Sequence, residues 1–218
     1  MKKERIGLFG GTFNPIHRGH LKAAEIVQKR LLLDKILFIP SYIPPHKESA
    51  EIASPFHRFK MVELALETYP KFLPSSIEIE AKGKSYSIIT LNKIKKLYPE
   101  ALIFFILGID AFLEIATWRS YEKVLTRCFF VVISRPGYEF KKAKEVLKGK
   151  YKGKTIELSG IGEAKSELRS SARIFFLPID TLDIASTTIR KKIRKRDSIK
   201  NLVSGTVEAY IRENKIYH

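Results

Sequence analysis

The sequence is best understood outward from one stretch near its N-terminus, Gly10-Gly11-Thr12-Phe13-Asn14-Pro15-Ile16-His17-Arg18-Gly19-His20. Four apolar residues, 6–9, stand directly before it, and apolar residues spaced by three or four follow it over 21–31. The apolar run predicts a buried strand, and the spacing predicts an amphipathic helix. We therefore expect a strand-to-helix turn, which is where α/β proteins usually bind phosphates.

Two kinds of residue in this turn suit an anion. Gly10 and Gly11 allow the backbone to approach a ligand and expose its N–H groups. His17 and His20 are three positions apart at the helix entrance, so both imidazoles can face one anion. A single glycine pair or a single histidine is more typical of an ordinary surface turn, but the whole string favours a binding site.

Length and composition place the chain among α/β proteins with an ample core. We predict a single domain over 1–218, with a C-terminal helical part over about 186–218. Hydrophobic residues make up 44% of the chain, and 40 Lys and Arg against 23 Asp and Glu give a formal charge of +17. That charge favours anionic partners. The same excess is typical of a lysine-rich proteome, so charge alone does not choose a partner.

The cellular setting follows from cysteine usage and from apolar runs. Cys128 is the only cysteine, which excludes an intramolecular disulfide and a cysteine-based metal cluster. It lies in an apolar run, where we expect a buried side chain. Residues 1–5 leave no room for a signal peptide, and the run 101–109 is too short for a membrane span. We expect a cytoplasmic protein without a membrane partner.

Five further apolar or alternating segments predict strands. They are Ile36–Pro40, Ile77–Glu80, Leu102–Leu107, Phe129–Ser134 and Ile174–Pro178. Between them lie helices with recognisable starts. Ser54 and Pro55 predict an N-cap and a first turn, followed by an apolar stripe at Phe59, Val62 and Leu66. Ser87 is a candidate cap for a helix with its stripe at Leu91, Ile94 and Leu97.

The second half of the chain is less regular. Residues 140–154 predict a helix plus a turn, and 159–173 an insertion loop. Ser186 or Thr187 is the expected N-cap of a basic helix, and a last amphipathic segment surrounds Val203, Val207 and Ile211. The charged run 190–196 is expected to be mainly a solvated face.

The alternation of strands and helices predicts a Rossmann-like, doubly wound, mostly parallel sheet with helices on both faces and a small C-terminal helical subregion. Ligands of such sheets bind beyond the carboxyl ends of the strands. Five loops are expected to emerge at that edge: 10–20, 41–47, 108–110, 135–137 and 186–190. Their polar residues would then form one site.

These loops also carry a family resemblance. The stretch 10–20 resembles the first motif of the HxGH nucleotidyltransferase superfamily, and within it the bacterial nicotinate-nucleotide adenylyltransferases. Further matches follow in the same order over about residues 5–212: Pro44-Pro45-His46-Lys47, Arg58 with Met61, Ser85-Tyr86-Ser87, Gly108-Ile109-Asp110, Thr117-Trp118, Arg135-Pro136-Gly137-Tyr138 and Ile184–Arg190. HxGH alone identifies only the superfamily, whereas the ordered set identifies the family.

The resemblance implies a reaction in NAD biosynthesis. AMP is transferred from ATP to nicotinate mononucleotide, giving deamido-NAD (nicotinate adenine dinucleotide) and pyrophosphate. The attacking phosphate is already an anion, so direct in-line attack without a general base or covalent intermediate is expected. Mg²⁺ would be held mainly by the ATP phosphates and water, with no metal ligands from the protein.

The resemblance also implies roles for individual residues. The catalytic group would be His17, His20, Lys47 and Arg190. ATP would contact Gly10, Gly11, Thr12, Phe13, His17, His20, Gly108, Asp110, Arg135, Ser186, Thr187 and Arg190. Nicotinate mononucleotide would contact Thr12, Asn14, Lys47, Tyr86, Ser87, Trp118 and Arg119. Within these sets, Trp118 would stack on the pyridine ring, and backbone N–H groups at Tyr86, Ser87 and Arg119 would recognise its carboxylate.

Five features depart from the family pattern. Asn14 stands where Asp is usual, and Ala185 replaces the first of two serines. Ile89 replaces a common Asp, Ser204 a common Pro, and the stretch 159–173 is longer than in typical members. Ala185 removes one hydroxyl from the loop that the resemblance assigns to phosphate binding.

Three alternatives stay open at this point. The substrate could be nicotinamide mononucleotide or another phosphorylated compound. A basic RNA-binding α/β protein is a different class, disfavoured because the aromatic residues fall mostly in apolar runs and not on a stacking surface; no nucleic-acid partner is expected. The oligomeric state is also open, with a homo-oligomer among the options.

Overall fold

The computed structural model describes residues 3–44, 51–135, 137–147, 151, 153–158, 173–180 and 182–218. Its strands are β1 (Arg5–Gly11), β2 (Lys35–Pro40), β3 (Phe72–Pro74), β4 (Leu102–Gly108), β5 (Phe129–Ile133), β6 (Thr155–Glu157) and β7 (Ile174–Leu177). Its helices are α1 (Arg18–Leu31), α2 (Pro55–Leu66), α3 (Ser87–Leu97), α4 (Ile109–Leu113), the 3₁₀ helix η1 (Ile115–Thr117), α5 (Tyr121–Arg127), α6 (Phe140–Glu145), α8 (Ser186–Arg194) and α9 (Gly205–Glu213). No helix in these described ranges is long and apolar enough to span a membrane.

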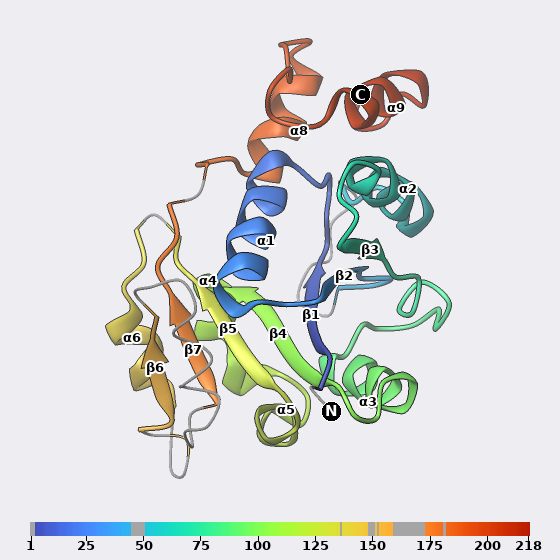
Figure 1. Cartoon of the computed structure of the whole chain (residues 1–218). Coiled ribbons are helices and arrows are strands. Elements are labelled where there is room, and N and C mark those ends of the chain that lie inside the picture. The colour runs from blue at the N-terminus through green and yellow to red at the C-terminus, as the bar shows by residue number, and fades with distance from the viewer. Residues whose placement is uncertain are drawn as a thin grey trace. The chain divides into compact units, whose positions relative to one another are not determined.

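The strands form one seven-stranded sheet in the order β3-β2-β1-β4-β5-β7-β6. The ladders that join β1 to β4, β4 to β5, β5 to β7 and β7 to β6 are all parallel. Figure 1 shows these strands side by side with helices in the connections. The predicted α/β class with a Rossmann-like parallel sheet and C-terminal helices is confirmed.

By packing, the chain divides into two compact units. The first unit comprises Met1–Phe9, Ala23–Ile36 and Tyr86–Thr181, and the second comprises Gly10–Lys22, Leu37–Ser85 and Leu182–His218. The chain passes between them within β1, α1 and β2, and again after Ser85 and after Thr181. A single domain over 1–218 would require the two units to fold together. That stays a prediction.

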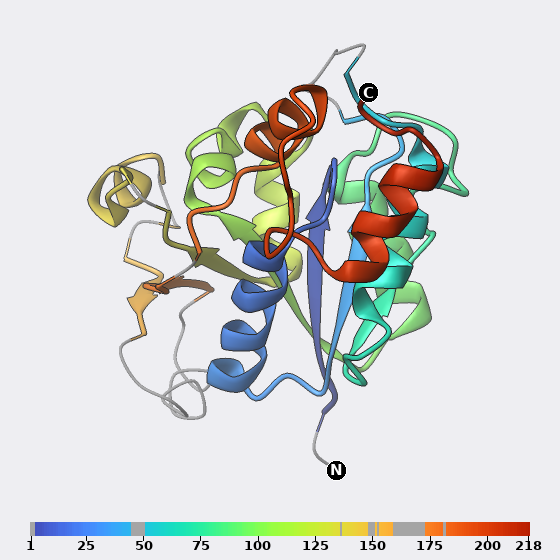
Figure 2. The ribbon, with the colours of Figure 1, turned by 90° about the horizontal axis from the view of Figure 1, so that it is seen from above.

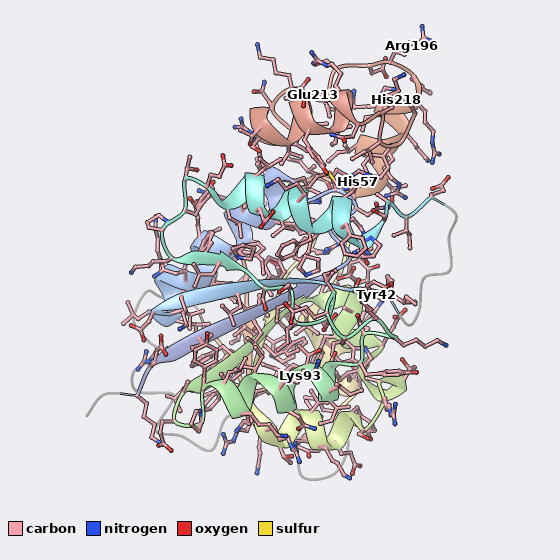
Figure 3. All side chains as sticks on the ribbon, turned by 90° about the vertical axis from the view of Figure 1, so that its right-hand side faces the viewer. Tyr42, His57, Lys93, Arg196, Glu213 and His218 are labelled. Atoms are coloured by element: carbon pink, nitrogen blue, oxygen red, sulfur yellow. The ribbon has the colours of Figure 1, made fainter. Side chains whose placement is uncertain are left out.

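The first unit is organised around stacked aromatic residues on its parallel strands. Phe105 of β4 stands beside Phe130 of β5 in the ladder register, with ring centroids 5.6 Å apart. Phe112 of α4 meets the rings of both Phe130 and Phe176 edge-on. In Figure 3, α1 lies on one side of β1 and α3 and α5 on the other. Strands covered on both faces are continuously apolar, as the sequence predicted.

The second unit contains two helices joined by specific polar contacts. Figures 1 and 2 both show α9 beside α2. The Thr206 hydroxyl donates to the Leu64 carbonyl at 3.2 Å, and His57 Nδ1 lies 2.9 Å from the Tyr210 hydroxyl. Ser54 caps α2 through the His57 N–H, as predicted. These two contacts hold the C-terminal helix α9 against α2.

One predicted strand is wrong. Residues 77–80 form turns, because the Glu80 N–H donates to the Ser76 carbonyl and the Ser76 hydroxyl donates to the Glu80 carboxylate. The alternating Ile77-Glu78-Ile79-Glu80 pattern still buries Ile79, but as part of a turn. The strand of this region is instead β3. The next residue, Ser75, donates its N–H to the Phe38 carbonyl of β2.

Two helix starts are shifted by one residue from the prediction. Tyr86 and Ala185, not the neighbouring Ser87 and Ser186, occupy the N-cap positions of α3 and α8, and neither helix has a side-chain cap. The segment predicted as a helix plus turn over 140–154 contains the short helix α6, and the strand β6 follows it. The predicted insertion loop 159–173 lies outside the described residues, apart from Arg173.

Candidate active site

The turn formed by residues 10–20 belongs to the second unit, and a buried arginine donates a hydrogen bond to it. Arg58 of α2 is fully buried, and its guanidinium donates to three carbonyls: Ala53 at 2.9 Å, Thr12 at 2.8 Å and Tyr42 at 3.0 Å. Burial lowers the pKa of Arg58 to about 10, so the group stays charged at neutral pH. One side chain therefore ties the 10–20 turn to Tyr42, which follows β2, and to Ala53, which precedes α2.

The two histidines of this turn lie against each other. Their ring centroids are 3.7 Å apart, and the His17 N–H donates to His20 Nδ1 at 3.2 Å. Because Nδ1 of His20 accepts, the proton of the neutral ring is on Nε2, which is then a donor. Gly19 keeps this arrangement, since a Cβ there would lie 3.1 Å from His17 Nδ1 and 3.3 Å from the Leu182 carbonyl.

Residues in the first half of α8 form hydrogen bonds to the same turn. Ser186 Oγ donates to the Pro15 carbonyl at 2.9 Å, and Arg190 Nη1 donates to the Asn14 carbonyl at 3.0 Å. With Ala185 at the N-cap and no acidic residue in the first turn, the first N–H groups of α8 have no side-chain acceptor within the helix cap. Such a helix terminus attracts anions.

Arg190 has one N–H group, on Nε, that makes no hydrogen bond to the described residues. Its side chain is only 13% exposed, and its Nε is buried without a hydrogen-bond partner among the described residues. Its Nη2 pairs with the Glu51 carboxylate at 3.4 Å, and Arg194 reaches the same carboxylate at 2.8 Å. The two guanidinium groups, Arg194 foremost, hold the pKa of the Glu51 carboxyl below its usual value.

A second cluster belongs to the first unit, at the carboxyl ends of β4 and β5. Asp110 and Arg135 form an ion pair at 3.2 Å, and Asp110 Oδ1 is buried without a partner among the described residues. Gly108 makes room for it, because a Cβ there would lie 2.3 Å from Asp110 Oδ1 and 2.9 Å from Arg135 Nε. The Gly-x-Asp spacing thus has a steric reason.

The predicted pyridine-binding residues are also in the first unit. Trp118 is half-buried and meets the ring of Phe105 edge-on, with centroids 5.8 Å apart. The guanidinium of Arg119 lies over the Tyr86 ring at 4.9 Å. Ser87 is the first residue of α3, a helix without a side-chain cap or an acidic first turn. Its N–H groups are therefore available to an anion.

The predicted site residues thus fall into two groups by unit. The second unit contains the loop and α8 residues: Gly10, Gly11, Thr12, Phe13, Asn14, His17, His20, Ser186, Thr187 and Arg190. The first unit holds the others: Tyr86, Ser87, Gly108, Asp110, Trp118, Arg119 and Arg135. Lys47 lies outside the described residues.

Three residues that matter to this arrangement were not predicted as site residues: Arg58, Glu51 and Tyr217. Arg58 was noted only as a match to the family, and the predicted apolar stripe of its helix assigned the core to other positions. A charged side chain in a helix gives no local sign that it is buried. Tyr217 donates to Asn14 Oδ1 at 2.7 Å from the far end of the chain, which no local pattern indicates.

Comparison with known proteins identifies the family. Residues 8–192 match the family described as Cytidylyltransferase-like. A protein of Pelobacter propionicus is 41% identical over 215 residues, covering 98% of both chains, and one of Desulfatibacillum aliphaticivorans is 38% identical over 217 residues, covering 98% of this chain and 99% of that one. Both carry the name "Probable nicotinate-nucleotide adenylyltransferase". This chain belongs to the nicotinate-nucleotide adenylyltransferase family.

Solved structures of the nicotinate-nucleotide adenylyltransferase family share the fold. The Plasmodium falciparum nicotinic acid mononucleotide adenylyltransferase complexed with NaAD superposes with a TM-score of 0.72 at 19% identity, over 98% of this chain and 97% of that one. The same enzyme complexed with APC gives a TM-score of 0.69 at 18% identity, with the same coverage. At this identity the likeness establishes the fold alone.

Two departures from the family pattern have structural accounts. Ala185 sits at the N-cap of α8, so the missing hydroxyl leaves the helix terminus uncapped. The Ser204 hydroxyl caps α9 by accepting the Val207 N–H at 3.3 Å. A proline at this position would have no hydroxyl to make this contact. Ile89 is 42% exposed on α3, and nothing in the structure explains its place there.

Proposed function

We propose that this protein transfers AMP from ATP to nicotinate mononucleotide, releasing pyrophosphate and forming deamido-NAD. The observation that carries the proposal is the full-length match, at 38 to 41% identity, to relatives named for this activity. A fold by itself does not imply a function. The contacts within each unit support the assignment of individual residues to parts of the two substrates.

The second unit supplies the donors that a triphosphate requires. The N–H groups at the uncapped start of α8 are suited to the β and γ phosphates. So is the Nε of Arg190, which has no hydrogen-bond partner among the described residues. Ser186 is already engaged by the Pro15 carbonyl, so we assign phosphate binding there to the backbone of Ser186 and Thr187. Arg190 would exchange its contact with Glu51 for phosphate oxygens.

His20 is the best-prepared donor to the reacting α-phosphate. With Nδ1 held by the His17 N–H, Nε2 of a neutral His20 carries the proton. During in-line attack, negative charge grows on the α-phosphate oxygens, and a preorganised donor stabilises that charge. The backbone N–H of His17 would fix this tautomer, and the His17 imidazole would share the anion.

The first unit offers complementary groups to the two nucleosides. Asp110 Oδ1 is an acceptor without a partner in the described part of the chain, which suits a ribose hydroxyl of ATP. Arg135 holds that carboxylate in place through its second oxygen. The ring of the half-buried Trp118 would stack on the pyridine ring, an arrangement that aromatic rings favour.

The start of α3 favours the acid over the amide. The N–H groups at Ser87 and the positive end of the helix dipole attract a carboxylate, whereas the NH₂ of an amide would face other donors. Arg119, stacked on Tyr86, adds positive charge to the same region. Nicotinate mononucleotide is therefore the substrate that this helix terminus supports.

In this reaction the protein has only to position the two substrates and to neutralise the charge of their phosphates. A phosphate oxygen of the mononucleotide attacks the α-phosphorus of ATP, the new P–O bond forms, and the bond to pyrophosphate breaks. Mg²⁺ enters with ATP as part of the substrate; no three His, Cys, Asp or Glu side chains gather as a metal site in the described ranges. We assign Lys47 to the phosphates as a mobile cation.

The decisive experiment compares the acid and amide mononucleotides as substrates. With ATP and the purified chain, we expect a higher kcat/KM for the acid, with pyrophosphate and deamido-NAD formed in equal amounts. A preference for the amide would overturn the acid assignment, and pyrophosphate release without either mononucleotide would overturn the reaction. His20→Ala is expected to lower kcat by about two orders of magnitude, as loss of one preorganised donor does.

Binding can be followed separately, because Trp118 is the only tryptophan. Stacking of a pyridine ring should quench its fluorescence on addition of the acid mononucleotide, whereas RNA should leave it unchanged. A matched control is Trp118→Phe, which removes the signal but keeps an aromatic ring. Quenching by RNA instead would favour the nucleic-acid alternative.

A further inference from the structure

We propose that Tyr217, the next-to-last residue of the chain, is a positioning residue that acts through Asn14 on residues 10–20, the phosphate-binding turn of the proposed function. Its hydroxyl donates to Asn14 Oδ1 at 2.7 Å, across 203 residues of sequence. The proposal rests on the proposed function, since it assumes that this turn holds ATP. In this proposal the C-terminal tail contributes to catalysis without contacting the substrate.

Asn14 is the junction through which the tail acts. Its Oδ1 also accepts the Ala53 N–H at 3.0 Å, and its Nδ2 donates to the Glu51 carbonyl at 3.1 Å. Its backbone carbonyl accepts Arg190 Nη1 at 3.0 Å. A single residue, 5% exposed, thus joins the tail, the loop before α2 and the arginine of α8.

This pattern of donors explains an amide at position 14. Two donors converge on Oδ1, and one carbonyl accepts from Nδ2, so the side chain needs an acceptor and a donor at the same time. A carboxylate would set an oxygen against the Glu51 carbonyl. Because the whole amide is orientated by its neighbours, loss of the Tyr217 donor would loosen it.

The tail is held in place independently of this hydrogen bond. Ile216 is buried and its N–H donates to the Ile211 carbonyl at 3.0 Å, while Val207 and Ile211 anchor α9 in the core. Figure 3 shows the chain end at His218 among the C-terminal helices, above His57 of α2. Removing only the Tyr217 hydroxyl should therefore leave the tail folded.

Two further observations indicate that surrounding contacts hold Tyr217 in the position that bonds to Asn14. The backbone of Tyr217 has a φ of 72°, a left-handed conformation that costs a bulky residue energy and persists only where surrounding contacts impose it. Removal from water raises the pKa of the Tyr217 hydroxyl, although Arg190 and Arg58 lie near enough to oppose the shift. The phenol therefore stays a donor over the whole physiological range.

The test compares Tyr217→Phe with Tyr210→Phe. Both variants lose one tyrosine hydroxyl from the C-terminal segment, but Tyr210 bonds to His57 and not to the phosphate-binding turn. We expect Tyr217→Phe to raise KM for ATP about three- to tenfold, the range for one lost hydrogen bond, and Tyr210→Phe to stay within about twofold of the wild type.

The double variant Asn14→Ala with Tyr217→Phe shows whether the effect passes through Asn14. If it does, Tyr217→Phe adds nothing to the KM of Asn14→Ala, because the two residues act as one unit. Multiplicative effects on KM would overturn the proposal. So would equal KM values for Tyr217→Phe and Tyr210→Phe.

A second readout does not depend on the reaction. Amide hydrogen exchange over residues 10–20 should be faster in Tyr217→Phe than in wild type, and unchanged in Tyr210→Phe. If the wild type proved unable to form deamido-NAD, the proposed function would fall, but this comparison would still decide the positioning role. Equal exchange over 10–20 in both variants would overturn it.

Discussion

Replacement of Gly108 by alanine is the sharpest test of the cluster in the first unit. The backbone of Gly108 has φ −70° and ψ 154°, which any residue adopts, so no backbone strain is introduced. The new Cβ would lie 2.3 Å from Asp110 Oδ1, whereas ordinary contact begins at 3.4 Å. The carboxylate must withdraw by about 1 Å, the difference between these two distances.

The structure separates the two consequences of that movement. The Asp110–Arg135 pair is partly exposed, with 38% and 49% of the side chains accessible, so its loss should cost at most about 1 kcal/mol of stability. We propose that this carboxylate binds a ribose hydroxyl of ATP, and its displacement should then cost about 1.5–3 kcal/mol of binding, which is about 10- to 150-fold in KM for ATP. Gly108→Ala should therefore be a folded enzyme with weak ATP binding.

Steady-state kinetics and thermal unfolding of Gly108→Ala check this expectation. The matched control is Gly205→Ala at the start of α9, where a Cβ would meet nothing within 4 Å. That control should keep its KM and be as stable as wild type or slightly more so. An unchanged KM in Gly108→Ala would refute the reasoning, as would an equal KM increase by Gly108→Ala in an Asp110→Ala background, where the clash with Oδ1 is absent.

Three other changes test separate features. Ser204→Ala removes the cap of α9 and should lower the free energy of unfolding by about 1 kcal/mol without changing KM, measured by urea denaturation. Cys128 is 3% exposed and burial raises the pKa of its thiol, so a thiol reagent at pH 8 should modify it only after unfolding. In Glu51→Gln, the melting temperature should fall below that of wild type at pH 7, and the gap should close as the pH falls below 4.5. The reason is that a carboxyl with a lowered folded-state pKa stabilises the fold above its ordinary pKa, 4.5 here, and loses that contribution as it is protonated. A gap that widens in acid would contradict the Arg190 and Arg194 contacts to this carboxyl.

The local pattern of the chain was sufficient for most elements because their burial is regular. The apolar run 102–107 became the central strand β4, and the hydroxyl and proline of Ser54-Pro55 started α2 as predicted. Prediction was wrong where two structures share one pattern. Ile77-Glu78-Ile79-Glu80 buries Ile79 equally well as a turn, and the short strand β6 carries too few residues for any period.

Helix starts were off by one residue for a related reason. A serine near a helix start can cap it, or it can stand one place further on and use its hydroxyl elsewhere. Ser186 does the latter, because the Pro15 carbonyl lies within its reach. Only the fold brings that carbonyl to it, from 171 residues away in the sequence. The ordering of the loop motifs, by contrast, needed no structure to be recognised.

The sequence by itself determined the parallel α/β sheet, the glycine- and histidine-containing turn and the family to which the chain belongs, because each depends on residue types at short spacing. The tertiary structure alone decided that Arg58 is buried against three carbonyls, that Glu51 pairs with Arg190, and that Tyr217 orientates Asn14. These contacts join residues far apart along the chain. A hydrogen bond depends on the distance between two atoms, and for such pairs only folding sets that distance.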